Sequence, residues 1–189
     1  MIVGFRLWAL GFDRAHTRAQ SLKPKALIKD GLLAEFDHEV GTTRRLLERL
    51  PHDRETLAWK PHVKSMSLGG LATHIATLPV WGSTILNSSS FDLAMLPPRE
   101  EKTSPAEILA AFELNVKETR GWMDRTDAEY LDRWTLKRSG QDLFSLPKVA
   151  AFRNFVMHHL IHHRGQLSVY LRLNDIPVPA MYGPSADEG

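Results

Sequence analysis

The sequence predicts an all-α protein, a four-helix bundle with long connections and a non-helical C-terminal tail. Four long segments repeat apolar residues at the three- and four-residue spacing of amphipathic helices. Serine and proline stand where two of these helices should begin. Three prolines in residues 174–189 prevent that segment from being helical throughout. With 189 residues, the chain is long enough for one domain with a proper core.

The first two helices are expected at residues 25–50 and 67–86. Ser67 is suited to cap the second helix, because a serine side chain accepts a hydrogen bond from a first-turn backbone N–H group. Pro79 lies inside that helix, where it removes a backbone hydrogen bond and should kink the chain about one turn after His74. The expected apolar stripe of the first helix consists of Leu32, Phe36, Val40, Leu47 and Leu50.

The third and fourth helices complete the expected bundle. Ser104-Pro-Ala-Glu107 matches a capping box with proline in the first turn, so the third helix should run from there to about Asp124. The fourth should run from Pro147 to about Leu173. Residues 87–103 predict a loop, and residues 130–146 a turn-like segment or small hairpin. Both connections are longer than a simple bundle needs, so at least one should cross the bundle or cover a pocket.

Four histidines within the fourth helix are the main functional signal. Residues four apart lie on the same helical face, so each His-x-x-x-His pair can reach one divalent metal ion. On a helical wheel His159 and His163 fall at about 280° and 320°, on the shoulder of the apolar stripe. His158 and His162 fall at about 180° and 220°, away from the stripe. We therefore predict that His159 and His163 face the interior, and that the other pair faces solvent or a partner.

His74 is the predicted third ligand. It falls at about 300° on the second helix, again on the buried shoulder. A lone histidine on an apolar face is more often a core residue bonded to a neighbour, but here it could meet the inward pair. Three imidazoles leave coordination positions open, which is typical of a catalytic metal site. We expect the remaining four histidines to be solvated, namely His16, His38, His52 and His62.

Composition excludes several classes of function. Without cysteine the chain has no disulfide, thiolate zinc finger or cysteine nucleophile, and a cytoplasmic location fits this composition. The sequence contains no stretch of 18 apolar residues, so we predict no membrane span. The first 25 residues carry a net charge of +4 against +2 for the whole chain, so residues 1–24 are interpreted as a basic N-terminal extension. No nucleic-acid motif is present, and we expect a small-molecule substrate and no nucleic-acid partner.

Four segments within about residues 25–188 match a known family. They are Trp59-Lys-Pro-His-Val-Lys-Ser-Met-Ser-Leu-Gly69, Leu71-Ala-Thr-His74, His159-Leu-Ile-His-His-Arg-Gly-Gln166 and Tyr182-Gly-Pro-Ser-Ala-Asp-Glu188. In these segments the chain resembles the DinB-like family. The resemblance implies a four-helix bundle and a metal held by His74, His159 and His163, the histidines that the helical wheels select. Relatives include thiol-dependent S-transferases and isomerases that use low-molecular-weight thiols such as bacillithiol or mycothiol, and proteins proposed as metal-dependent hydrolases. Many members have no assigned reaction.

Three neutral imidazoles leave a divalent ion its full charge, which favours a strong Lewis acid. A thiol bound there would lose its proton at neutral pH and could attack an electrophile, whereas a bound water could hydrolyse an ester or amide. Imidazole suits zinc and nickel, which we expect first, and iron, manganese or copper stay open. We predict a metal-dependent enzyme that transfers a low-molecular-weight thiol to an electrophilic small molecule. A metal-dependent hydrolase and a non-catalytic metal-binding stress or interaction protein are the alternatives.

Several residues are candidates for supporting roles. Gln166 either orients a histidine ligand or is an ordinary boundary residue. Arg164 is expected to form a salt bridge with an acidic tail residue such as Asp187. The outward histidines either join a homodimer contact or are solvated, and no general acid or base can be assigned. The candidate pocket residues are Trp81, Asn115, Trp122 and Tyr182. The two tryptophans could instead pack in the core, and the tyrosine could instead anchor the tail.

Overall fold

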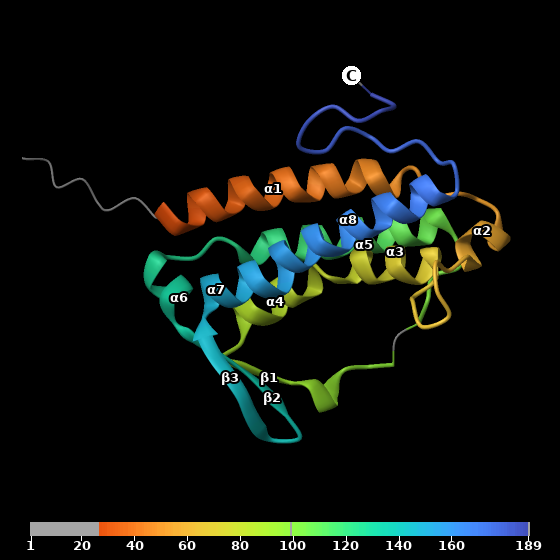
Figure 1. The fold of residues 1–189 in the computed structure, drawn as a ribbon. Helices are drawn as coiled ribbons and strands as arrows, with labels where there is room; N and C mark the ends of the chain where they lie inside the picture. Colours follow the sequence, from red (N-terminus) through yellow and green to blue (C-terminus); the bar gives the residue numbers. More distant parts are fainter. Residues whose placement is uncertain (1–26, 99, 189) are drawn as a thin grey trace, which may run out of the picture.

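The computed structural model describes residues 27–98 and 100–188, so the predicted N-terminal extension lies outside the described residues. The protein is mostly helical, and long helical segments lie side by side along one direction (Figure 1). These segments are α1 (Leu27–Leu47), α3 (Leu68–Thr77) with α4 (Val80–Asn87), α5 (Pro105–Trp122), and the continuous run of α7 (Lys148–Phe152), the π-helical segment η2 (Arg153–His158) and α8 (His159–Leu173). Two short helices, α2 (Arg54–Ala58) and α6 (Asp127–Leu131), lie in the connections.

The prediction of an all-α fold is wrong in one respect, because a three-stranded sheet is present. Its strands are β1 (Ser90–Asp92), β2 (Arg133–Arg138) and β3 (Gln141–Pro147), in the order β1-β2-β3. The antiparallel β2–β3 pair is the hairpin that the sequence left open, and β1 pairs with β2 in parallel. β1 and the 3-10 turn η1 (Leu93–Met95) fall within the predicted loop.

The Asp92 carboxylate connects β1 to the turn of the β2–β3 hairpin. Asp92, at the end of β1, accepts hydrogen bonds from the backbone N–H groups of Ser139 (2.9 Å) and Gly140 (2.6 Å) in the hairpin turn. Both turn residues have positive φ, 49° and 81°, as the two-residue turns of hairpins require. Hydrogen bonds from the backbone N–H groups of Ala94, Gly140 and Ser139 lower the pKa of Asp92.

The predicted second helix is two helices rather than one kinked helix. Ser67 caps α3 as expected, since its hydroxyl accepts a hydrogen bond from the Gly70 N–H group at 2.9 Å. α3 ends before Pro79, which cannot donate the next backbone hydrogen bond, and α4 begins directly after it. The Pro79 carbonyl instead accepts hydrogen bonds from the N–H group of Gly82 (2.7 Å) and the hydroxyl of Thr119 on α5.

Gly82 allows α4 to approach its neighbours closely. A Cβ atom at this position would overlap the Thr119 side chain and lie 2.9 Å from Cε2 of Phe152. The absence of a side chain therefore lets α4 pack against both α5 and α7 just after the break at Pro79. This packing fixes the direction in which the second helical run continues.

The π-helical segment corrects the predicted phase of the fourth helix. The wheel, which assumes regular α-helical turns, placed Val149 at the centre of the buried stripe. Instead Ala151 and Phe152 are fully buried, and Val149 is only partly buried. The wider π turn rotates the residues that precede it relative to those that follow. After the π segment, Leu160 and Leu167 are buried as the wheel predicted.

The core has two parts. The larger one fills the space between the long helices, and the smaller one, with Trp134 and Leu136 of β2 at its centre, lies where the sheet meets α4 and α7. Within residues 27–98 and 100–188, no helix combines the length and hydropathy of a membrane span.

Candidate metal centre

Three histidines from two helices converge on one point. His74 lies on α3, and His159 and His163 lie one turn apart on α8. One ring nitrogen of each lies within 4.8 Å of the other two, and the Nε2 atoms of His74 and His159 are 3.3 Å apart. Nitrogen ligands at 2.0–2.1 Å in tetrahedral geometry are themselves about 3.3 Å apart. The cluster could therefore hold a divalent metal ion.

The local structure explains why these side chains meet. α3 packs against α8, and the break at Pro79 comes only after the turn that carries His74. His159 is the first residue of α8, immediately after the π-helical segment. His163 follows four residues later and so lies on the same face. All three histidines are partly exposed, so the cluster lies at the edge of the helical core rather than within it.

The two outward histidines do not belong to the cluster. His158 and His162 are exposed, and the ring of His162 lies beside that of His163 at a centroid distance of 4.8 Å. The inward and outward pairs that the wheel separated are thus separate in the structure. His38, predicted to be solvated, is exposed and stacks on Tyr182.

Gln166 contacts one histidine of the cluster. Its side-chain oxygen lies 2.7 Å from Nδ1 of His163. A hydrogen bond from Nδ1–H to this oxygen leaves the lone pair on Nε2, the nitrogen that a metal would need. The same contact restrains rotation of the imidazole ring.

The predicted salt bridge between Arg164 and Asp187 is wrong. Asp187 pairs with Arg172, in the last turn of α8. Arg164 is 1% exposed and pairs with Glu39 of α1, with 2.6 Å between Nη2 and Oε2. Arg164 lies on the side of α8 that meets α1, where a tail carboxylate does not reach it. The sequence offered one indication of this pair: Glu39 is an acidic residue next to Val40 of the apolar stripe of α1, where a buried carboxylate needs a basic partner.

Tyr182 joins this buried pair to the C-terminal tail. Its hydroxyl donates a hydrogen bond to Glu39 at 2.7 Å and accepts one from Arg164. Burial and the hydrogen bond to Glu39 raise the pKa of Tyr182. The recorded contacts of this residue thus anchor the tail to α1 and α8, and its role in closing a pocket stays a prediction.

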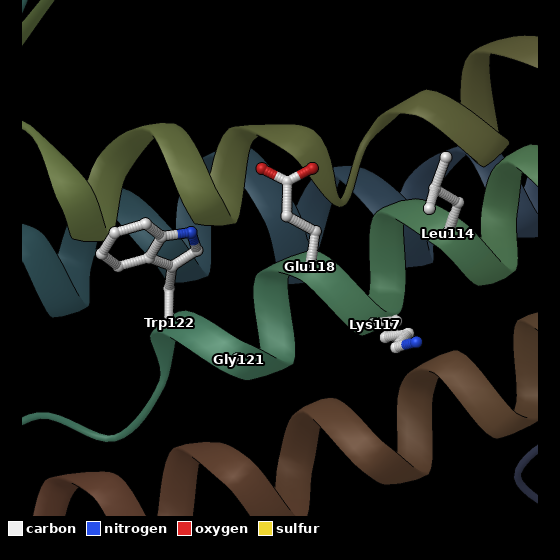
Figure 2. Close-up of a pocket in the computed structure, with 5 residues that line it drawn as sticks. All are labelled: Leu114, Lys117, Glu118, Gly121 and Trp122. Atoms are coloured by element: carbon white, nitrogen blue, oxygen red, sulfur yellow. The ribbon is translucent and has the colours of Figure 1, made fainter.

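The other candidate pocket residues have different surroundings. Trp81 packs against the rings of Phe91 and Phe155, with centroids 5.5 and 5.7 Å away. Asn115 donates a hydrogen bond to the Ala76 carbonyl of α3 at 2.9 Å. Trp122 lines a hollow of about 510 Å³ along α5, shown in Figure 2, whose other lining residues are Leu114, Lys117, Glu118 and Gly121. No residue of the histidine cluster lines this hollow, and the roles of these residues in binding a substrate stay predictions.

Comparison with known proteins finds one matching family by sequence and similar folds by structure. The model of the DinB family matches residues 22–189. The chain is 24% identical over 159 residues to the uncharacterized protein YrdA of Bacillus subtilis, covering 84% of this chain and 90% of that protein. A DinB-like protein of Bacillus cereus has a similar fold, with a TM-score of 0.61, 22% identity, and 81% of this chain and 97% of that chain covered. For the DinB-like protein YjoA of Bacillus subtilis the TM-score is 0.60 at 19% identity, with 84% and 99% covered.

Removing one partner of the buried pair of Arg164 and Glu39 should strongly destabilise the protein. Replacing Glu39 by alanine leaves a buried guanidinium without its counter-charge, and we expect the free energy of unfolding to fall by about 3 kcal/mol. Glu35→Ala, one turn earlier on α1, removes an exposed ion pair with Arg153 and should cost less than about 1 kcal/mol. Urea denaturation of both variants measures the difference. Equal losses of unfolding free energy in the two variants would show that the buried ion pair matters no more for stability than the exposed one.

Proposed function

Because the chain belongs to the DinB family and its structure brings three histidines together, we propose that it is a metal-dependent enzyme in which His74, His159 and His163 hold one divalent ion. The observation that carries the proposal is the 3.3 Å separation between the Nε2 atoms of His74 and His159, which lie on different helices. The third imidazole lies within reach of the same point. Zinc or nickel is the first expectation for this donor set, and iron or manganese the next.

The proposed reaction is transfer of a low-molecular-weight thiol to an electrophilic small molecule. The thiol loses its proton to solvent, its sulfur bonds to an electrophilic carbon, and the leaving group departs with the electron pair of the broken bond. The bound ion would supply Lewis acidity that favours the thiolate. The chain has no cysteine, so the sulfur must come from the cosubstrate.

The chain's own residues support this proposal in two ways. The three histidines are partly exposed rather than buried in the core, which favours access of a ligand from solvent. The Gln166 side-chain oxygen lies 2.7 Å from Nδ1 of His163 and restrains this ring; donation from Nδ1–H to that oxygen would make Nε2 the metal-binding nitrogen. The same exposure would admit water, so a metal-dependent hydrolase is the second candidate. A cytoplasmic location and a homodimer stay predictions.

Metal content of single histidine variants tests the ligand assignment. We expect His74→Ala, His159→Ala and His163→Ala each to lose most of the bound metal, because two imidazoles hold a divalent ion less firmly than three. His158→Ala and His162→Ala are matched controls from the same helix and should keep it. Elemental analysis of the purified variants measures this. Metal loss in the two controls, with retention in the other three, would overturn the assignment.

The reaction class can be tested with the metal-loaded protein. We expect product to form from an aryl halide only when a low-molecular-weight thiol is present, and this activity should disappear in His159→Ala. The same preparation is assayed with ester and amide substrates without thiol. Hydrolysis without thiol would support the second candidate instead. Absence of turnover in both assays, with metal bound, would identify a non-catalytic metal-binding protein.

A further inference from the structure

The hollow on α5 that Figure 2 shows plays no part in the proposed function. Its lining residues, all from this helix, are Leu114, Lys117, Glu118, Gly121 and Trp122. Leu114, Glu118 and Trp122 follow one another a turn apart along the helix (Figure 2). The two apolar side chains at its ends are accessible, with Leu114 65% and Trp122 37% exposed. An exposed hollow with apolar borders is a candidate interaction surface.

Gly121 contributes no side chain to fill this hollow. No atom lies within 4 Å of the position that a Cβ atom would take at this residue, so the packing of the single chain does not require glycine there. Glycine also weakens a helix relative to alanine. The space over Gly121, next to Trp122 in the sequence, is therefore open to a side chain from another molecule.

Two adjacent charges of the hollow are not used within the molecule. In the part of the chain that the structure describes, neither Lys117 nor Glu118 has a side-chain hydrogen bond or an ion pair. Glu113 and Arg120 of the same helix, by contrast, each form an ion pair with a residue of α1. Adjacent opposite charges on one face are self-complementary, because an identical face turned by 180° places each charge opposite its counter-charge.

The order of the lining residues along α5 fits a second copy of the same helix. In an antiparallel pair of helices, a two-fold axis that passes between Lys117 and Glu118 brings each Lys117 opposite the partner's Glu118. Leu114 lies three positions before Lys117, and Gly121 lies three positions after Glu118. The same axis therefore places each Leu114 opposite the partner's Gly121, where the hollow is open.

We propose that this face of α5 is a homodimer interface, in which two copies of the helix pack antiparallel about a two-fold axis between Lys117 and Glu118. Two ion pairs form across the axis, and each Leu114 enters the space over the partner's Gly121. Stable interfaces bury about 1,200–2,000 Å² in total, which is more than one pair of helices provides, so the dimer should dissociate in the micromolar range. The inference does not rest on the proposed function, since none of these residues belongs to the histidine cluster.

Charge reversal tests the register of the two helices. Analytical ultracentrifugation of the full-length protein should show a dimer whose fraction rises with protein concentration. Lys117→Glu and Glu118→Lys should each raise the Kd of the dimer about tenfold or more, because each change places like charges opposite each other. The double variant, in which the two charges are exchanged, should restore the dimer. An equimolar mixture of the two single variants should also restore it, as a heterodimer.

Two further variants complete the test. Lys64→Glu is the matched control, because it reverses an exposed lysine outside α5 and should leave the Kd unchanged. Leu114→Ala removes the apolar contact without a change of charge and should raise the Kd about tenfold. Because the double variant carries both charge reversals, its recovery also shows that neither reversal unfolds the protein.

Three results would overturn the inference. The first is a protein that stays monomeric above about 100 μM. The second is a dimer whose Kd is unchanged in both charge reversals, whether it forms through the outward histidines or through another face. The third is failure of both the double variant and the mixture to restore the dimer. The measurement needs no metal, so failure of the metal assignment leaves its result standing.

Discussion

The packing of α3 against α8 is the constraint on which the candidate centre depends. Two of its histidines lie on one helix and meet by helical geometry alone, but the third comes from a helix more than 80 positions away in sequence. Metal ligands tolerate displacements of only about 0.5 Å from their productive positions. A small shift or rotation of either helix would therefore separate His74 from the other two histidines.

Different interactions hold each side of this seam. On the α3 side, the break at Pro79 ends the helix soon after His74, and contacts of Thr119 and Gly82 fix α4 beyond the break. On the α8 side, the residue after His163 is Arg164, whose guanidinium is buried against Glu39 of α1. Rotation of α8 would pull this charge away from its partner, so the ion pair opposes rotation of the histidines. Breaking the ion pair by such a rotation would leave a buried charge uncompensated, which is costly.

The features that could be predicted from the sequence are those that depend on neighbouring residues, such as helix faces and helix starts. Helical periodicity separated His159 and His163 from the outward histidines, and serine capping located the starts of α3 and α5, where Ser104 accepts a hydrogen bond from the Glu107 N–H group at 3.3 Å. Contacts between distant segments were not predictable in this way. The strand β1 has three residues and exists through pairing with β2, more than 40 positions later. The π-helical segment and the partner of Arg164 also depend on tertiary packing, which no local pattern of residue types records.

The coordination shell of an added zinc ion tests the three-histidine proposal most directly. Zinc-loaded protein can be studied by X-ray absorption at the metal edge, which reports the number, type and distance of the ligands. Our account predicts three imidazole nitrogens at about 2.0–2.1 Å, with at least one further light atom from water or substrate. A shell dominated by carboxylate oxygens, or one with a single imidazole, would contradict it.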